Sequence, residues 1–233
     1  MSVINIASYI DHTLLKPTAT HIDINKICNE ALVYGFAAVC VPPPLVRIAA
    51  ATAQPAIKVA TVIGFPFGYS ATKAKLAEAE QAIADGADEL DIVINLVALK
   101  EGNWDRLEEE MNILTRHAHA SGRIVKVIIE SGILTEEEII QCCTIYSRVG
   151  VDFLKTSTGY AEKGASLAAV RLIRQHLPSR IKIKASGGIR DYAFAASLVE
   201  AGADRLGCSA SVEIVKGEHN SPAAQHPGPG GGY

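Results

Sequence analysis

The sequence has no long apolar run, no excess of positive charge and no cysteine pattern typical of a metal site. No window reaches 18 apolar residues without a charge or a turn signal, and no basic segment followed by an apolar run opens the chain. A net charge of −3 provides no basic surface for nucleic acid. The five cysteines lack metal-ligand spacing. We therefore expect a soluble, cytoplasmic protein that binds neither nucleic acid nor membranes and needs no metal or other cofactor.

The composition favours one large domain. Hydrophobic residues make up 48% of the 233 residues and charged residues 20%, so the chain can bury a large core. We expect this domain to span residues 1–216. Residues 217–233 are rich in proline and glycine and end in Tyr233, so a flexible tail is predicted there.

A helix that ends at a glycine and is followed at once by a short apolar strand recurs four times. The leading glycines are Gly35, Gly86, Gly150 and Gly202. Other strands are expected over residues 10–14, 57–63, 124–129 and 181–185, and helices from about residue 21 and over 71–85, 104–120, 135–149, 166–175 and 191–201. Eight alternating strands predict a single α/β (β/α)8 TIM barrel, preceded by a short N-terminal helix. A doubly wound sheet, the alternative, would need a glycine-rich dinucleotide turn after its first strand, which is missing.

The repeat places four residues at one height in the barrel. Cys40, Asp91, Lys155 and Gly207 each lie five positions after the leading glycine of their strand. Inward side chains of one layer come from alternate strands of such barrels. Asp91 and Lys155 are therefore expected to point into the barrel near its carboxyl end.

Lys155 is the main catalytic candidate, because it interrupts a short apolar strand. A lysine there is commonly at an edge or reaches the surface, but a buried one beside a second cation loses its proton more easily. Lys184, on the next strand, is the expected second cation, and Lys182 shares its face. A neutral lysine, a second lysine and an inward aspartate suit Schiff-base chemistry with proton transfer, as in an aldol reaction.

Two loops near the end of the chain predict a phosphate site. They follow the seventh and eighth strands, where these barrels frequently bind phosphate. Their glycines let backbone amides approach an anion, and serine and arginine side chains add hydrogen bonds. The loops cover residues 186–190 and 207–211.

Six segments in the same order resemble the signatures of the deoxyribose-phosphate aldolase family. They are residues 10–17, 61–66, 89–95, 126–130, 153–159 and 184–190. The resemblance implies a class I, metal-independent lyase of deoxyribonucleotide and nucleoside catabolism. Such an enzyme reversibly cleaves 2-deoxy-D-ribose 5-phosphate to acetaldehyde and D-glyceraldehyde 3-phosphate.

The resemblance also implies roles for individual residues. Lys155 is the Schiff-base nucleophile, Lys184 lowers its pKa, and Asp91 transfers protons through water. Asp11 belongs to the hydrogen-bonded network near the substrate hydroxyl, and Tyr233 assists proton transfer at C2. The implied phosphate-binding residues are Thr158, Gly159, Gly187, Gly188, Ile189, Arg190, Gly207 and Ser209.

Three positions depart from the family pattern. Pro42 replaces a common asparagine, Tyr160 a lysine that helps some relatives to bind phosphate, and Ala210 a serine. Cys40 lies in the layer of Lys155, where a reactive aldehyde could reach its thiol. The expectation is that it is instead a small packing residue.

Other interpretations stay open. Asp91 could act as the base of a phosphosugar isomerase without a covalent lysine, or the barrel could be a silent phosphosugar sensor. Trapping with borohydride separates the aldolase from both. We expect a homodimer. We also expect residues 108–110 to form a solvated helix face.

Overall fold

The structure, a computed structural model, describes residues 5–219 as a closed barrel of eight parallel strands. Each strand pairs with its neighbours in sequence, and the last pairs with the first. The strands are β1 (Ile10–Thr13), β2 (Ala38–Val41), β3 (Lys58–Ile63), β4 (Glu89–Val93), β5 (Ile124–Ile128), β6 (Phe153–Lys155), β7 (Lys182–Ser186) and β8 (Arg205–Cys208). The predicted TIM barrel is therefore confirmed, with each strand within a few residues of its expected position.

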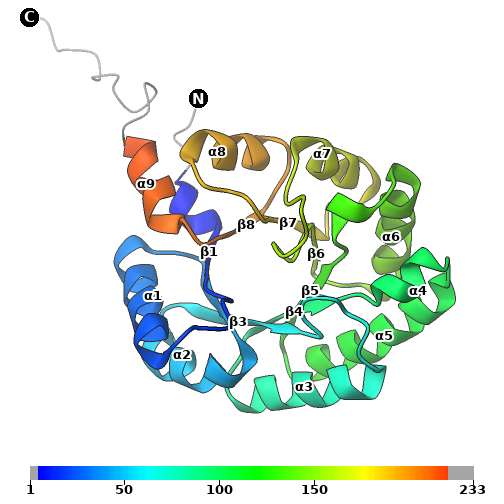
Figure 1. The fold of residues 1–233 in the computed structure, drawn as a ribbon, viewed down its shortest axis with the longest axis horizontal. Coiled ribbons are helices and arrows are strands. Elements are labelled where there is room, and N and C mark those ends of the chain that lie inside the picture. Colours follow the sequence, from blue (N-terminus) through cyan, green and yellow to red (C-terminus); the bar gives the residue numbers. More distant parts are fainter. Residues whose placement is uncertain (1–4, 220–233) are drawn as a thin grey trace, which may run out of the picture.

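Helices form a ring outside the strands (Figure 1). They are α1 (His21–Tyr34), α2 (Val46–Ala53), α3 (Thr72–Ala84), α4 (Leu96–Lys100), α5 (Trp104–Ala120), α6 (Glu136–Val149), α7 (Leu167–His176), α8 (Tyr192–Glu200) and α9 (Ser211–His219). The short 3-10 helices are η1 (Ile6–Tyr9), η2 (Pro43–Leu45) and η3 (Ser131–Ile133). The sequence did not predict α2, α4 and α9. No helix within residues 5–219 is long and apolar enough to cross a membrane.

The last described helix extends past the predicted start of the tail. The tail was expected from residue 217, but α9 continues to His219, so that boundary falls inside a helix. The last helix packs beside η1, and the backbone N–H of Ile6 donates to Glu218 Oε1 at 3.4 Å. Residues 220–233, with Tyr233, lie outside the described part of the chain.

Local sequence signals explain the clearest helix boundaries. Thr20 and Thr135 both form capping boxes at the first turns of α1 and α6. Both helices end at a glycine in the left-handed region, Gly35 with φ 69° and Gly150 with φ 78°. A residue with a side chain is strained at such φ values, so glycine ends the helix and the next strand begins within a few residues.

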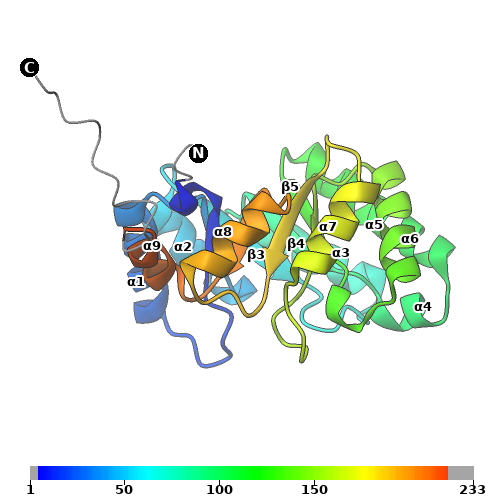
Figure 2. The same ribbon diagram turned by 90° about the horizontal axis from the view of Figure 1, so that it is seen from above.

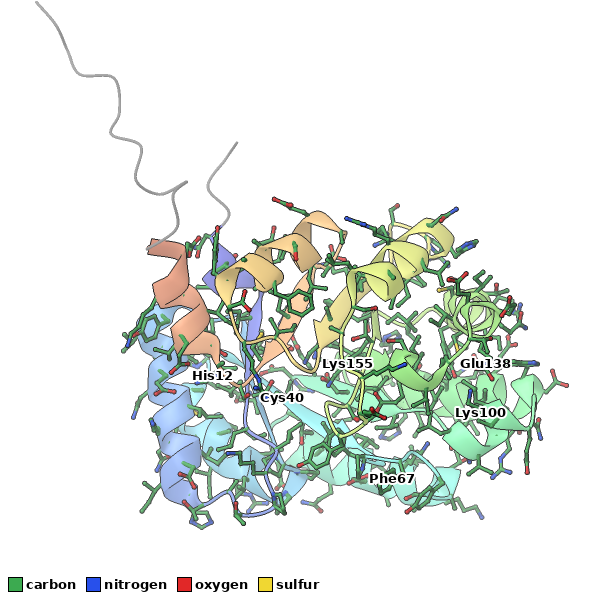
Figure 3. The ribbon with its side chains drawn as sticks, turned by 45° about the horizontal axis from the view of Figure 1, so that its top comes forward. His12, Cys40, Phe67, Lys100, Glu138 and Lys155 are labelled. Carbon is green, nitrogen blue, oxygen red and sulfur yellow. The ribbon has the colours of Figure 1, made fainter. Side chains whose placement is uncertain are left out.

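The barrel interior is divided into an apolar and a charged part. Cys40, Ala60 and Val62 on β2 and β3 form a small apolar cluster, against which Leu15 and Phe65 pack. The charged side chains come from β1 and from β4 to β8. Figure 3 shows Cys40 and Lys155 within the ring of strands, whereas Lys100 and Glu138 lie on its outside, between α4 and α6. The larger hydrophobic core fills the space between strands and helices.

The expectation of a solvated face at residues 108–110 is wrong for Glu110. Its side chain is buried and pairs at 2.8 Å with Lys75 of α3, which is fully buried. Lys75 also donates to the carbonyl oxygen of Val93, at the end of β4, at 2.8 Å. The pair therefore attaches α3 and α5 to the strand that carries Asp91.

Replacing Glu110 by alanine should reduce the free energy of unfolding by about 3 kcal/mol, because Lys75 would remain buried without its carboxylate. Urea denaturation measures this change. Glu109→Ala, one residue away on the exposed side of α5, is the matched control and should change stability by about 0.5 kcal/mol or less. Equal losses in both variants would contradict a specific contribution from the buried pair.

Candidate active site

Seven ionisable side chains meet inside the barrel. The four cations are Lys126, Lys155, Lys184 and Arg205, and the three carboxylates are Asp11, Glu89 and Asp91. Six of them are buried, and Arg205 is partly buried. They come from six strands, so the closed barrel brings together residues that are up to 194 positions apart in sequence.

Asp91 is at the centre of this cluster. Its Oδ2 accepts hydrogen bonds from the Nζ atoms of Lys155 and Lys184, both at 2.7 Å. Its Oδ1 accepts from Lys126 Nζ, also at 2.7 Å. Burial favours the neutral acid, but the three lysines outweigh burial and hold the pKa of Asp91 well below its usual value. The predicted meeting of Asp91 and Lys155 is thus confirmed as geometry.

Lys184 is held as a cation. Its Nζ donates to Asp11 Oδ2 at 2.5 Å and to Asp91 Oδ2 at 2.7 Å. Burial acts against the charged form, but the two aspartates outweigh it and raise the pKa of Lys184 above its usual value. Lys184 therefore supplies a fixed positive charge next to Lys155, its direct partner in the register of β6 and β7.

Lys155 is in the opposite electrostatic situation. Burial lowers the pKa of Lys155 most strongly, Asp91 partly opposes this effect, and the charge of Lys184 lowers it further. The net direction is downward, towards the neutral amine that attacks carbonyl groups. Lys182, the other candidate on β7, is exposed and lies over the Phe153 ring, with Nζ 5.7 Å from the ring centroid. The structure thus places Lys184, and not Lys182, beside Lys155.

Sequence reasoning missed three members of the cluster. Lys126 pairs with Glu89 at 2.6 Å, and Arg205 pairs with Asp11 at 2.5 Å and with Glu89 at 3.6 Å. Burial opposes the charge of Lys126, but Asp91 and Glu89 outweigh it and raise its pKa. The signal was present for Lys126, since it interrupts an apolar strand as Lys155 does. Nothing comparable marks Glu89 and Arg205, which begin their strands and look like surface residues.

A cavity of about 330 Å³ opens above Lys155 at the carboxyl end of the strands. All eight predicted phosphate-binding residues line it: Thr158, Gly159, Gly187, Gly188, Ile189, Arg190, Gly207 and Ser209. Its other wall is Thr13 to Lys16, between β1 and α1. The β1–α1 and β6–α7 loops leave the barrel on the same side, the lower side in Figure 2. Within residues 5–219, Lys155 is the one member of the interior cluster that lines this cavity.

The glycines of the cavity are required by close backbone contacts. A Cβ at Gly187, where φ is 91°, would lie 3.0 Å from the Cα of Gly164 and 3.4 Å from that of Gly159. Gly187 also accepts a hydrogen bond from the N–H of Ala165 at 3.0 Å. The loops after β6 and β7 therefore approach each other backbone to backbone at Gly159, Gly164 and Gly187, where no side chain covers the amide groups.

Glu130 holds the loop after β6 in place through hydrogen bonds to Thr158. It is a non-glycine residue with φ 56°, and its buried carboxylate accepts hydrogen bonds from both the N–H and the hydroxyl of Thr158. Burial raises the pKa of Glu130. A strained backbone with a buried carboxylate is typical of a functional site. Nothing in the residues around Glu130 indicates this conformation.

Tyr160 closes one side of the cavity. Its hydroxyl donates to the carbonyl oxygen of Leu15 at 2.8 Å, and its ring packs edge-on against Phe65, with 5.2 Å between centroids. This position thus joins two loops instead of presenting a cation. Lys16 and Arg190 are the exposed cations in the cavity wall. Of the other departures, Pro42 precedes the turn η2, and Ala210 lies just before α9.

Cys40 lies next to the interior lysines and is shielded from solvent. It is fully buried, and burial raises the pKa of its thiol. The expectation that it packs is confirmed by its contacts with Ala60 and Val62. In Figure 3 it lies close to Lys155 inside the barrel, with His12 on the neighbouring strand β1. No group of residues in the described part of the chain has the composition of a metal site.

Comparisons with known proteins agree on one family. A family model described as DeoC/LacD family aldolase matches residues 5–212. A deoxyribose-phosphate aldolase of Thermococcus gammatolerans is 49% identical over 93% of this chain and 98% of its own. One of Caldicellulosiruptor saccharolyticus is 49% identical over 90% and 96%.

Solved structures give the same result. One described as "QR15, an Aldolase" aligns with a TM-score of 0.88 and 44% identity, over 91% of this chain and 95% of the other. The tetrameric deoxyribose phosphate aldolase of Aeropyrum pernix aligns with a TM-score of 0.85 and 34% identity, over 91% and 89%.

Proposed function

This chain belongs to the DeoC/LacD aldolase family, and from that premise we propose that it reversibly cleaves 2-deoxy-D-ribose 5-phosphate to acetaldehyde and D-glyceraldehyde 3-phosphate. The observation that carries the proposal is the position of Lys155. It is a buried lysine with a lowered pKa, and it lines the same cavity as the glycine-rich loops after β6 and β7 and the residues Arg190 and Ser209. An aldolase is a carbon–carbon lyase, and the metal-free class uses a lysine of this kind.

The reaction begins when the neutral amine of Lys155 attacks C1 of the open-chain sugar. Loss of water gives an iminium, which withdraws electrons from C2. The C3 hydroxyl then loses its proton, the C2–C3 bond breaks, and glyceraldehyde 3-phosphate leaves. The enamine that remains takes a proton at C2, and water hydrolyses the resulting iminium to acetaldehyde and the free lysine.

The interior cluster provides the charges for these steps. Lys184 stays positive between Asp11 and Asp91, so it disfavours a proton on Lys155. Asp91, within 2.7 Å of Lys155, is placed to exchange protons with the nitrogen and, through water, with the substrate. Asp11 holds Lys184 in position on the side of β1. Tyr233 lies outside the described residues, and its role in proton transfer at C2 stays a prediction.

The phosphate is proposed to bind at the loops after β6, β7 and β8. These loops, with Ser209 and Arg190, line the same cavity as Lys155, and backbone amides, hydroxyl groups and guanidinium groups are the usual donors to a phosphate. A phosphosugar would thus extend from its C1, at the amine, to its 5-phosphate at these loops. Lys16 is an additional cation in the cavity wall. It lies in the same wall as Tyr160, which stands where some relatives carry a phosphate-binding lysine.

Gly187→Ala should weaken binding of the phosphorylated substrate. The new Cβ would press on Gly164 at 3.0 Å, and the residue would be strained at φ 91°, so both phosphate-binding loops must shift. We expect KM for 2-deoxyribose 5-phosphate to rise about 10-fold or more, the result of one or two lost anion contacts. Cleavage of unphosphorylated 2-deoxyribose should change much less. Equal losses for both substrates would place the phosphate elsewhere.

The cleavage assay tests the proposal directly. The purified chain is incubated with 2-deoxyribose 5-phosphate and EDTA, and acetaldehyde is measured by its reduction with alcohol dehydrogenase and NADH. Acetaldehyde should form at the same rate with and without EDTA. Binding of the phosphosugar without cleavage would instead support the sensor, and formation of an isomeric sugar phosphate the isomerase.

The cellular setting follows from the proposed reaction. We propose that the enzyme acts in the cytoplasm, in the breakdown of deoxyribonucleotides and nucleosides, which supply its substrate. We also propose a homodimer, although the structure from Aeropyrum pernix is described as tetrameric. Light scattering coupled to size-exclusion chromatography distinguishes the two assemblies.

A further inference from the structure

A pair of charged residues lies at the floor of the barrel, on the side of the cluster away from the cavity. Glu89 and Arg205 begin β4 and β8, and neither lines the cavity above Lys155. Arg205 pairs with Asp11 at 2.5 Å and with Glu89 at 3.6 Å. Its guanidinium lies over the Phe153 ring, with Cζ 5.6 Å from the centroid. We call Glu89 and Arg205 the floor pair.

The charges of the interior cluster do not balance when every group is ionised. Four cations face three carboxylates, and all seven are connected by ion pairs. An excess charge inside a protein is costly because it has lost its hydration. The cluster becomes neutral when one cation releases its proton.

The contacts determine which cation releases it. Arg205 cannot lose a proton in a protein. Lys184 has two carboxylate partners, Asp11 and Asp91, and Lys126 has Asp91 and Glu89, both closer than 3 Å. Within residues 5–219, Lys155 has a single carboxylate partner, Asp91, which it shares with the other two lysines. Lys155 is therefore the least stabilised cation of the four.

We infer that the floor pair sets the protonation of Lys155: the charge of Arg205 keeps the proton off the amine, and that of Glu89 limits the effect. Arg205 and Glu89 are positioning residues, since they act through Asp11 and Lys126 and lie away from the cavity. The inference rests on the proposed function only in taking the neutral amine of Lys155 as the reactive form.

The remaining groups around Lys155 lie outside the ion-paired cluster. Cys40 of β2 is a buried thiol, and β3 presents Ala60 and Val62. Glu130, after β5, is a further buried carboxylate whose charge interacts with that of Lys155. Its hydrogen bonds go to Thr158, and within residues 5–219 it forms no ion pair with the four cations, so the variants tested below leave its contribution unchanged. The other groups are those of the cluster itself, on β1 and β4 to β8.

The inference predicts opposite shifts for two variants. Arg205→Met removes a positive charge, so the proton binds Lys155 more tightly and the acidic limb of the kcat/KM profile should move to higher pH. Glu89→Gln removes a negative charge and should move the limb to lower pH. Each shift should be about one pH unit, the size expected for one unit charge in the same buried cluster.

Two further variants control for structural damage. Arg205→Lys keeps the charge and should leave the limb in place. The double variant Arg205→Met/Glu89→Gln removes one charge of each sign, so it should return the limb to within about 0.3 pH units of the wild type. Circular dichroism across the pH range confirms that each variant is folded. If Arg205→Met does not fold, Glu89→Gln and the double variant still test the direction.

The outcomes separate this inference from the proposed function. Opposite shifts that cancel in the double variant support the floor pair. Unmoved limbs, or shifts of the same sign, overturn it, provided that borohydride still traps the substrate on Lys155. Failure of trapping in the wild type overturns the proposed function instead.

Discussion

Replacing Lys155 by methionine is expected to lower kcat/KM for 2-deoxyribose 5-phosphate by at least about 10⁴-fold, the scale of loss when a covalent nucleophile is removed. Methionine has a similar length and is apolar, so it fits the buried site. Because the pKa of Lys155 is lowered towards the neutral amine, an apolar side chain in its place removes no charge that the cluster needs for balance. Stability should therefore change little, and a coupled acetaldehyde assay measures the loss of rate.

Lys73→Met is the matched control for this variant. Lys73 lies on the exposed side of α3, away from the cavity. It should retain wild-type activity within about twofold. A Lys155→Met enzyme that kept more than a tenth of the wild-type rate would exclude a covalent role for Lys155.

Replacing Asp91 by asparagine is expected to lower kcat about 10³-fold, within the range for loss of a proton-transfer group. Asp91 is the shared partner of three lysines, and without its negative charge the amine of Lys155 is even less basic. Schiff-base formation should therefore persist while turnover fails. Breaking a buried ion network should also cost about 3 kcal/mol of folding stability.

The contrast between trapping and turnover is the decisive feature of the Asp91 variant. Borohydride reduction should still attach substrate to Lys155, whereas acetaldehyde release should nearly stop. Asp105→Asn, on the exposed first turn of α5, controls for the loss of a carboxylate and should change neither. Turnover within tenfold of the wild type in Asp91→Asn would remove Asp91 from the proton-transfer steps.

The meeting of Asp91 and Lys155 could be predicted from the sequence, because the glycine-led repeat shows which strand positions lie at the same level along the barrel axis. Strands that start a fixed distance after a helix-ending glycine begin at the same level of the barrel. This placed Asp91 and Lys155 together, and they lie 2.7 Å apart. The loops after β7 and β8 could be predicted for a similar reason, since their glycines follow directly from strand ends.

The rest of the cluster could not be predicted, because it depends on side-chain direction and length. Glu89 and Arg205 stand at the first positions of their strands, where charged residues usually face solvent. Only the closed barrel shows that Arg205 reaches inward to Asp11. The burial of Glu110 is missed for the same reason, since its partner Lys75 is on another helix.

The aromatic contact at the cavity mouth also required the three-dimensional structure. The sequence shows only that Tyr160 stands where some relatives carry a lysine. In the structure, its hydroxyl joins the loop after β6 to Leu15, at the end of β1, and Phe65 supports its ring. Such a contact depends on three loops from distant parts of the chain meeting at one edge of the barrel.

The central claim is that Lys155 forms a covalent iminium with the substrate. Intact-mass analysis after incubation with 2-deoxyribose 5-phosphate and sodium borohydride tests it most directly, with Lys155→Met as the control. We predict one stable adduct, mapped to Lys155 by peptide sequencing and missing in the control. An unmodified wild-type protein that still binds the phosphosugar, or an adduct that persists in Lys155→Met, would contradict the claim.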